Sequence, residues 1–168
     1  MRVCTLTDVK KKKPKRDHLL EYSKVVDASE LEGVTLLGLN FQVNPRFFGE
    51  RDDAELGYEI DVVEQKYEVE VNKAIAFIEC SVYATINDDR VFNCDAKYVV
   101  IYELAEACDP QAVKMFLKRV AVFACYPYFR AVVANLDWSA GTNLPPMPVH
   151  REGMKKRSKA ISAATVVE

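Results

Sequence analysis

The side chains best suited to acid–base chemistry in this 168-residue chain are three glutamates. Glu64, Glu68 and Glu70 lie in a stretch where apolar and polar residues alternate, and Glu68 and Glu70 fall on the same side of it. Two carboxylates on one side of a strand can act as a general acid–base pair. A row of acidic residues is also what the solvent-facing side of a strand carries, and this second interpretation is favoured.

The best-placed nucleophile is Cys125, beside the sequence Tyr126-Pro127-Tyr128. A thiol reacts only where its surroundings lower its pKa, and on the apolar side of a helix it is simply a small buried hydrophobic group. The five cysteines have no CxxC spacing, and His18 and His150 add no ligand cluster, so the sequence predicts reduced thiols and no metal site. Phosphate-binding and hydrolase motifs are also missing. We therefore expect a protein that is not an enzyme and uses no cofactor.

Charge is distributed unevenly along the chain. Residues 1–16 carry a charge of about +6 and residues 151–168 about +3, so a formal total of −2 leaves about −11 on residues 17–150. The sequence predicts one domain over 17–150 between two basic, disordered tails, 1–16 and 151–168. An acidic domain repels phosphate, which argues against nucleic-acid binding. With neither a signal region nor a membrane-spanning run, we expect a cytoplasmic protein without membrane insertion.

The element that organises the chain is a long helix over 109–141. Asp109 is a suitable N-cap, Pro110 suits the first helical position, and Gly141 suits the C-cap. Apolar residues recur at three- and four-residue spacing on both sides of Pro127. A proline inside a helix removes a hydrogen bond and clashes with the preceding turn, so we expect a kink or break near Pro127.

The residues before this helix are mainly typical of strands. A short helix is expected over 17–31, followed by strands near 34–43, 58–71, 74–86 and 91–104. Residues 45–57 are expected to form a loop on which Phe47 and Phe48 are exposed. The adjacent pair Val62-Val63 breaks the alternation and indicates a bulge, and Asn87 to Asp89 form a turn that makes 74–104 a hairpin. The fold class is therefore α+β, with a four-stranded antiparallel sheet and a long, Pro-interrupted helix packed against it.

Four stretches resemble the family of SecB-like chaperones. They are Tyr67 to Val71, the strand Val91 to Asp95, the sequence Tyr126-Pro127-Tyr128-Phe129-Arg130, and the Pro-rich segment Leu144 to Val149. The resemblance covers roughly residues 58–150 and implies a sheet with one long helix. It further implies a homotetramer that binds unfolded polypeptides in apolar grooves without nucleotide, through apolar burial and hydrogen bonds at the sheet edge.

The resemblance leaves two roles open. In export, an acidic surface of the chaperone binds the translocation ATPase SecA, and Asp95 matches one of its acidic positions. Gly38 and Gln42 stand where the family has acidic residues in its first strand, and Asn93 replaces a leucine. These departures, together with the extra N-terminal segment, are closer to the SecB-like chaperones of toxin–antitoxin modules, whose client is an aggregation-prone antitoxin.

Aromatic residues are the candidates for client binding, because their contacts are broad and tolerate many partners. The outer face of the sheet, with Tyr67, Val69 and Val71 or their counterparts on 74–86, is expected to carry more apolar surface than one helix can cover, which predicts a homo-oligomer. Two rival functions remain open: a small-molecule-binding or enzymatic domain with a cavity between helix and sheet, and an assembly or scaffold subunit. The groove candidates are Phe41, Phe47, Phe48, Tyr58, Tyr126, Tyr128 and Phe129.

Overall fold

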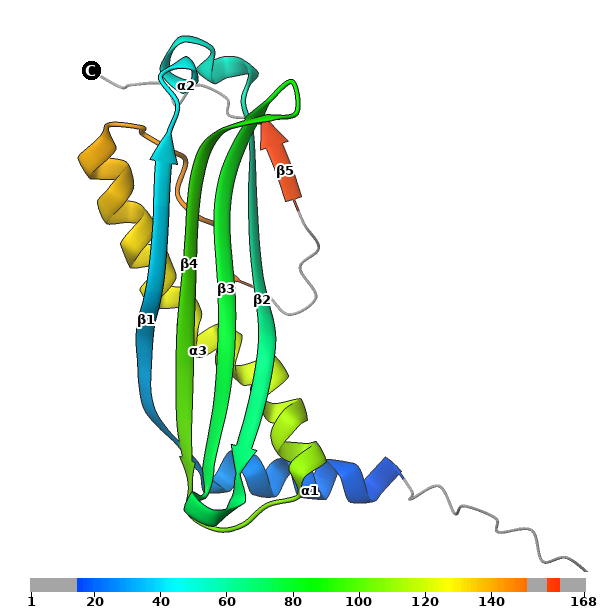
Figure 1. Cartoon of the computed structure of the whole chain (residues 1–168). Coiled ribbons are helices and arrows are strands. Elements are labelled where there is room, and N and C mark those ends of the chain that lie inside the picture. Colours follow the sequence, from blue (N-terminus) through cyan, green and yellow to red (C-terminus); the bar gives the residue numbers. More distant parts are fainter. Residues whose placement is uncertain (1–14, 151–156, 161–168) are drawn as a thin grey trace, which may run out of the picture.

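The computed structural model describes residues 15–150 and 157–160, which form one long antiparallel sheet with a long helix across one face (Figure 1). In chain order the elements are α1 (Lys15–Ala28), β1 (Ser29–Val43), α2 (Arg46–Gly49), the 3₁₀ turn η1 (Arg51–Asp53), β2 (Glu55–Glu68), the 3₁₀ turn η2 (Val69–Val71), β3 (Lys73–Ile86), β4 (Asp89–Leu104), α3 (Pro110–Ala140) and β5 (Arg157–Ala160).

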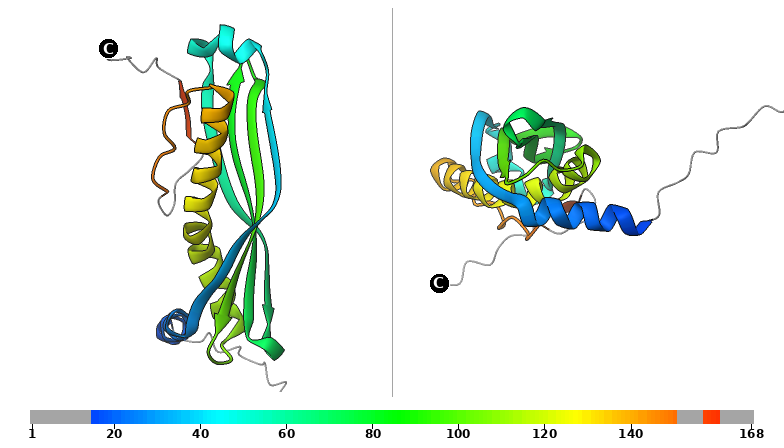
Figure 2. Two further views of the ribbon diagram at one scale, coloured as in Figure 1. Left: turned by 90° about the vertical axis from the view of Figure 1, so that its left-hand side faces the viewer. Right: turned by 90° about the horizontal axis from the view of Figure 1, so that it is seen from below.

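The molecule has two layers. Figure 2 shows the twisted sheet on one side and α3 on the other, while α1 lies across the end of the sheet where α3 begins. The ring of Tyr22 in α1 packs on Phe116 in α3, with 6.5 Å between the ring centroids. The α+β prediction of four antiparallel strands and one long helix is thus confirmed.

The strand order is β1-β4-β3-β2-β5, with every neighbouring pair antiparallel. Strands β2, β3 and β4 form the expected meander, and Asn87 and Asp88 make the β3–β4 turn with φ angles of 50° and 67°. The register of β2 against β3 shifts between Val62 and Glu64, so the bulge predicted there is confirmed. The first strand pairs with β4, at the far side of the sheet from β2.

The core lies between the sheet and α3 because both central strands bury every second residue over most of their length. Every second residue of β3, from Ala74 to Ile86, is buried, and β4 shows the same period. Small side chains such as Ala74, Ala76 and Ala84 lie on this inner face and leave room for the helix.

The position predicted for Tyr67 and its neighbours is wrong. Tyr67 pairs with the fully buried Ala74, so it faces the helix layer, and its hydroxyl accepts a hydrogen bond from the Cys108 N–H at 3.0 Å. Val69 and Val71 do not continue the strand, because the chain turns there through η2 and leaves by Asn72 in the left-handed conformation. Both valines are exposed, but on this turn and not on the outer face of the sheet.

Helix α3 begins and ends as its sequence predicts. The Asp109 carboxylate accepts a hydrogen bond from the Ala112 N–H at 2.9 Å, Pro110 is the first helical residue, and Gly141 closes the helix at φ 64°. Of the kink or break predicted at Pro127, the break is wrong, since α3 is one helix of 31 residues that contains the proline.

The helix continues through Pro127 because the backbone hydrogen bond that the proline removes lies on the solvent-exposed side of α3. Pro127 is exposed, and Phe123, whose carbonyl loses its hydrogen-bond donor, is 44% exposed, so water can reach that group. Cys125 and Phe129, on either side of the proline, are fully buried against the sheet. Apolar burial along the whole helix, worth about 1.5–3 kcal/mol for each large side chain, outweighs a proline cost of about 3 kcal/mol.

The two ends of the chain differ from the predicted tails where the structure describes them. Lys15 and Arg16 belong to α1, and Arg157–Ala160 form strand β5, which pairs with Glu55 to Tyr58 of β2. The remaining tail residues, 1–14, 151–156 and 161–168, lie outside the described residues. The helix expected over 17–31 is α1, which ends earlier because Ser29 to Leu31 already pair with β4.

Candidate functional site

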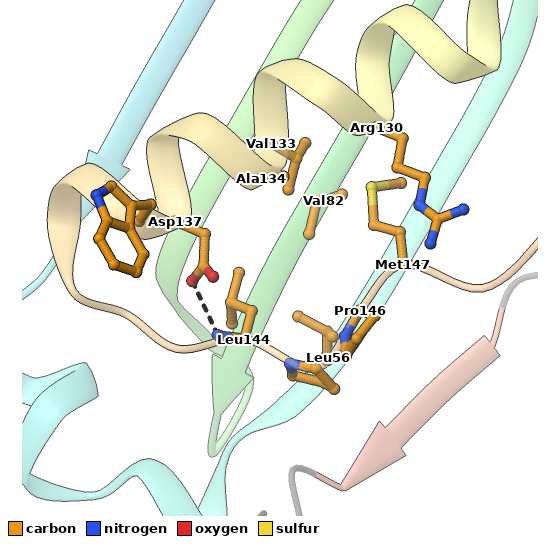
Figure 3. A pocket seen from close by; sticks show the side chains of 11 residues that line it. Leu56, Val82, Arg130, Val133, Ala134, Asp137, Leu144, Pro146 and Met147 are labelled. Atoms are coloured by element: carbon orange, nitrogen blue, oxygen red, sulfur yellow. Dashed lines mark hydrogen bonds between the residues drawn. The ribbon is translucent and has the colours of Figure 1, made fainter.

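An apolar pocket opens where the second half of α3 meets the Pro-rich segment, Leu144 to Val149 (Figure 3). Its volume is about 260 Å³, below the range of about 300–1,000 Å³ that is typical of small-molecule sites. Trp138, the single tryptophan of the chain, lies at its rim and is 88% exposed, so the pocket is open to solvent. The lining residues are Leu56, Val82, Arg130, Val133, Ala134, Asp137, Trp138, Leu144, Pro145, Pro146 and Met147.

One carboxylate holds the wall of this pocket in place. After Gly141 ends α3, the Asp137 side chain accepts a hydrogen bond from the Thr142 hydroxyl at 2.6 Å. It accepts a second from the Leu144 N–H at 2.8 Å (Figure 3). Thr142 is fully buried. The chain therefore reverses direction directly after the helix, and the Pro-rich segment runs back along α3.

Two further contacts fix the same segment. The Tyr126 hydroxyl donates a hydrogen bond to the Pro148 carbonyl, and Arg51 donates one to the Asn143 carbonyl. Three prolines keep the segment extended, which lowers the entropy lost when it is fixed against the helix. The pocket is thus preformed, with apolar walls from the sheet, α3 and this segment.

Charge at the pocket is confined to Arg130 and Asp137. Both hydrogen bonds of Asp137 are accepted by one carboxylate oxygen, Oδ1, and come from Thr142 and Leu144 of the chain itself, so this oxygen stabilises the fold. Arg130 is exposed and extends beside Met147 (Figure 3). The arrangement can bury an apolar side chain of a ligand while a cation remains available to a carboxylate or carbonyl at the rim.

None of the seven aromatic candidates lines this pocket. Phe47 and Phe129 are fully buried, Tyr126 is 6% exposed, and Phe41 and Tyr58 are partly buried against the core. Phe48 and Tyr128 are 53% and 51% exposed. Tyr126 contributes indirectly, through its hydrogen bond to Pro148.

The expected exposure of Phe47 is wrong. The two phenylalanines sit on α2, a single turn of helix, so their side chains diverge: Phe47 packs inward against Phe92 at 5.9 Å and Phe48 lies on its outer side at 5.7 Å. Phe41 also packs on Phe92, with the ring centroids 5.6 Å apart. This aromatic cluster closes the end of the core and leaves only Phe48 as a surface group.

Asp95 lies on the outer face of the sheet, opposite α3. Its carboxylate accepts hydrogen bonds from the Ser81 hydroxyl at 2.7 Å and from the Asn93 amide. A depression of about 340 Å³ there is also lined by Glu59, Asp61, Glu79 and Lys97, and Lys97 forms an ion pair with Glu79 at 2.8 Å. The surface is acidic as the resemblance implies, and contact with an ATPase there stays a prediction.

The thiols are placed for packing. Cys125 in α3 and Cys80 in β3 are both buried, with their sulfur atoms 3.9 Å apart. The neighbouring Cys125 thiol and burial both raise the pKa of Cys80, which keeps it protonated. Within residues 15–150 and 157–160 no three His, Cys, Asp or Glu side chains form a metal-binding group, and no helix there is long and apolar enough to span a membrane.

His150 ends the described part of the Pro-rich segment in an aromatic setting. Its ring lies 5.1 Å from that of Phe123 and 5.5 Å from that of Tyr126, and its Nδ1 atom is buried without a hydrogen-bond partner. Burial lowers the pKa of His150 below its usual 6.5, because the charged form is less well solvated there.

This lowered pKa predicts that the Pro-rich segment is held less firmly in acid. The contribution of His150 to stability is complete above the unfolded pKa of 6.5 and is lost as the pH falls through the lower folded value. We expect the free energy of unfolding to decrease more between pH 7.5 and 5.5 in the native chain than in His150→Phe, which keeps the ring contacts but does not titrate. Equal decreases in urea denaturation of the two proteins would contradict this.

Comparisons with known proteins agree with the fold and with the sequence resemblance. No protein-family model matches the chain. It is 27% identical over 108 residues to the SecB-like chaperone SmegB of Mycolicibacterium smegmatis, a match that spans 62% of this chain and 73% of SmegB. The solved structure of the Mycobacterium tuberculosis SecB-like chaperone Rv1957, in complex with a ChAD peptide from the HigA1 antitoxin, superposes with a TM-score of 0.63. That match has 15% identity and covers 80% of this chain and 98% of Rv1957. The chain is thus similar in sequence to SmegB and shares the fold of Rv1957.

Within this SecB-like fold, the pocket could have been found only in part from the sequence. The single tryptophan and the Leu-Pro-Pro-Met-Pro run six residues later are both visible in it. Their convergence with Leu56 and Val82 of two strands is not, because it depends on the chain reversing at Thr142. Aromatic content therefore pointed to α2 and the middle of α3, whereas the pocket lies at the end of α3.

Proposed function

We propose that this SecB-like protein is an ATP-independent chaperone that binds unfolded polypeptides, with the apolar pocket beside Trp138 as part of the binding site. The observation that carries the proposal is an open, preformed pocket with mainly apolar walls. Such a surface binds exposed apolar side chains of many sequences, because burial of apolar area is favourable and non-directional. The chaperone names of SmegB and Rv1957 support this role.

The small-molecule rival is disfavoured by the polar groups of the pocket. A binding site for one small compound needs several polar groups directed at it. Here the charged lining residues are Arg130 and Asp137, and one oxygen of Asp137 is already hydrogen-bonded to Thr142 and Leu144. An extended chain with apolar side chains fits these walls better than a polar metabolite does.

For the client we propose an aggregation-prone antitoxin, and a cytoplasmic location for both proteins. Support comes from Rv1957, whose solved structure contains an antitoxin peptide. The positions Gly38, Gln42 and Asn93, which depart from the export chaperones, favour the same choice over delivery of clients to SecA.

The test of chaperone activity is suppression of aggregation. A chemically unfolded client diluted into buffer should aggregate less when the purified protein is present without nucleotide, and added ATP should change nothing. An equal mass of an unrelated folded protein is the control. Aggregation at the same rate with and without the SecB-like chain would reject the proposed function.

We also propose that the protein is a homo-oligomer, and a tetramer as the resemblance to SecB-like chaperones implies. Large apolar side chains remain uncovered on the outer side of α3 and along β1, the edge strand beside β4. Burying such surface between copies is favourable, and a free strand edge invites pairing. Light scattering at micromolar concentration should give a mass above that of one chain, and a monomer would contradict this. These exposed residues are Leu31, Leu36, Leu37, Leu39, Met115, Phe123, Tyr128 and Trp138.

A further inference from the structure

Strand β5 covers one end of the β2 edge, directly beside the pocket (Figures 1 and 3). Its four residues pair antiparallel with Glu55 to Tyr58, so that Lys159 lies opposite Leu56. Leu56 is also one of the residues that line the pocket. The chain's own C-terminal strand therefore occupies the sheet edge next to the apolar site.

This end is the part of β2 most suited to pairing with an additional strand. The register of β2 shifts between Val62 and Glu64, so a regular edge runs only from Glu55 to Val62. A bulge bends the strand and interrupts the row of hydrogen-bonding groups. Strand β5 already covers the first half of this regular stretch.

Strand addition at this edge would place a client directly above the pocket. An extended peptide that pairs with a sheet edge gains main-chain hydrogen bonds, and alternate side chains point to the same face. Leu56 faces the helix layer, because its partner in β3 is the buried Ala84. Side chains of a client opposite Leu56 would accordingly be directed to the pocket side of the sheet.

We propose that β5 is an internal competitor of the client: it occupies the strand position that a bound polypeptide takes, and client binding displaces it. The proposal rests on the chaperone function proposed above and adds its regulation. A four-residue strand at the sheet edge forms few hydrogen bonds, and it is joined to α3 through the Pro-rich segment, so it can leave without unfolding the core. Its own sequence, Arg-Ser-Lys-Ala, is polar and supplies no large apolar group, whereas a client brings one.

Competition with β5 lowers the affinity for every client, so that only clients that bind strongly enough displace the strand. The apparent affinity is reduced by the fraction of molecules in which the edge is free. A short polar segment of a folded protein would pair with β2 about as weakly as β5 does and would displace it poorly. An unfolded chain with apolar residues would form the same strand pairing and also bury an apolar side chain in the pocket. Competition by β5 would thus favour the binding of unfolded clients over that of exposed strands in folded proteins.

The test compares two double variants of the full chain. Ser158→Pro/Lys159→Pro removes two consecutive backbone N–H groups of β5, one of which must point toward β2, and Ser158→Ala/Lys159→Ala makes the same side-chain losses but keeps both groups. The probe is fluorescein-labelled, reduced and carboxymethylated α-lactalbumin, an unfolded polypeptide. By fluorescence anisotropy, the proline variant should bind it roughly 5- to 30-fold more tightly than the native chain. The alanine variant should bind within about twofold of the native chain.

Hydrogen exchange measured by mass spectrometry shows which backbone amides lose or regain protection when β5 is displaced. In the proline variant the amides of Glu55 to Tyr58 should exchange faster than in the native chain and regain protection when the probe binds. In the native chain, binding should increase exchange in β5.

Equal probe affinity of the native and proline proteins, or β5 amides that stay protected in the native complex, would overturn the competition while leaving the chaperone function standing. A probe that binds neither protein would reject the proposed function and the competition with it.

Discussion

Phe47→Ser is expected to lower the free energy of unfolding by about 3–5 kcal/mol, the range measured for removal of a buried aromatic ring. Phe47 is fully buried and packs between Phe92 and Phe48. Serine leaves a cavity there and buries a hydroxyl. Since the free energy of unfolding of a domain of this size is about 5–15 kcal/mol, this substitution would remove a large part of it. Urea denaturation followed by circular dichroism measures the change.

Phe48→Ser is the matched control. Its side chain is 53% exposed, so we expect a loss of about 1 kcal/mol or less. Similar losses in the two variants would mean that α2 does not close the core as described. The double replacement of both residues is therefore unsuitable as a test of client binding, because unfolding would hide any effect on the surface.

Ala134→Phe is expected to weaken client binding about 10- to 100-fold. Ala134 is exposed on α3 and lines the pocket, so a phenyl ring there fills space within the cavity of about 260 Å³. Burying one large apolar side chain of a client contributes about 1.5–3 kcal/mol, which is a factor of ten or more in affinity. The measurement is the dissociation constant for an unfolded, fluorescently labelled polypeptide.

The control for this variant is Ala131→Phe. Ala131 is exposed one turn earlier on the same helix and does not line the pocket, so the same ring is added to the surface without filling the cavity. Its affinity should stay within about threefold of the native value. Native-like affinity in both variants would exclude the pocket as part of the client site.

Local sequence signals were sufficient for most of the fold. The caps Asp109 and Gly141, the Asn87 turn and the bulge at Val62 each act within a few residues, and each lies where its chemistry predicts. Pro127 was misjudged because the intrinsic helix cost was considered without the packing of Phe129 against the sheet, which only the assembled fold provides.

Contacts between distant segments account for what the sequence could not predict. The pairing of β1 with β4 and that of β5 with β2 join strands far apart in the chain, and no local pattern specifies either. The burial of Phe47 depends on where Phe92 lies, and the pocket depends on the Asp137 hydrogen bond to Leu144. Residue types predicted a protein that binds through apolar and aromatic side chains, but the location of its pocket required the three-dimensional arrangement.

Trp138 offers the most direct measurement of whether unfolded polypeptides occupy the pocket. It is the single tryptophan of the chain, it is 88% exposed, and it lines the pocket. Reduced and carboxymethylated ribonuclease A, an unfolded polypeptide without tryptophan, should shift the emission of Trp138 to shorter wavelengths in a saturable titration, because the indole ring becomes less exposed to water. Ala134→Phe should require a higher concentration for the same shift. Binding of the polypeptide, detected by anisotropy, with unchanged Trp138 emission would contradict a client site at this pocket.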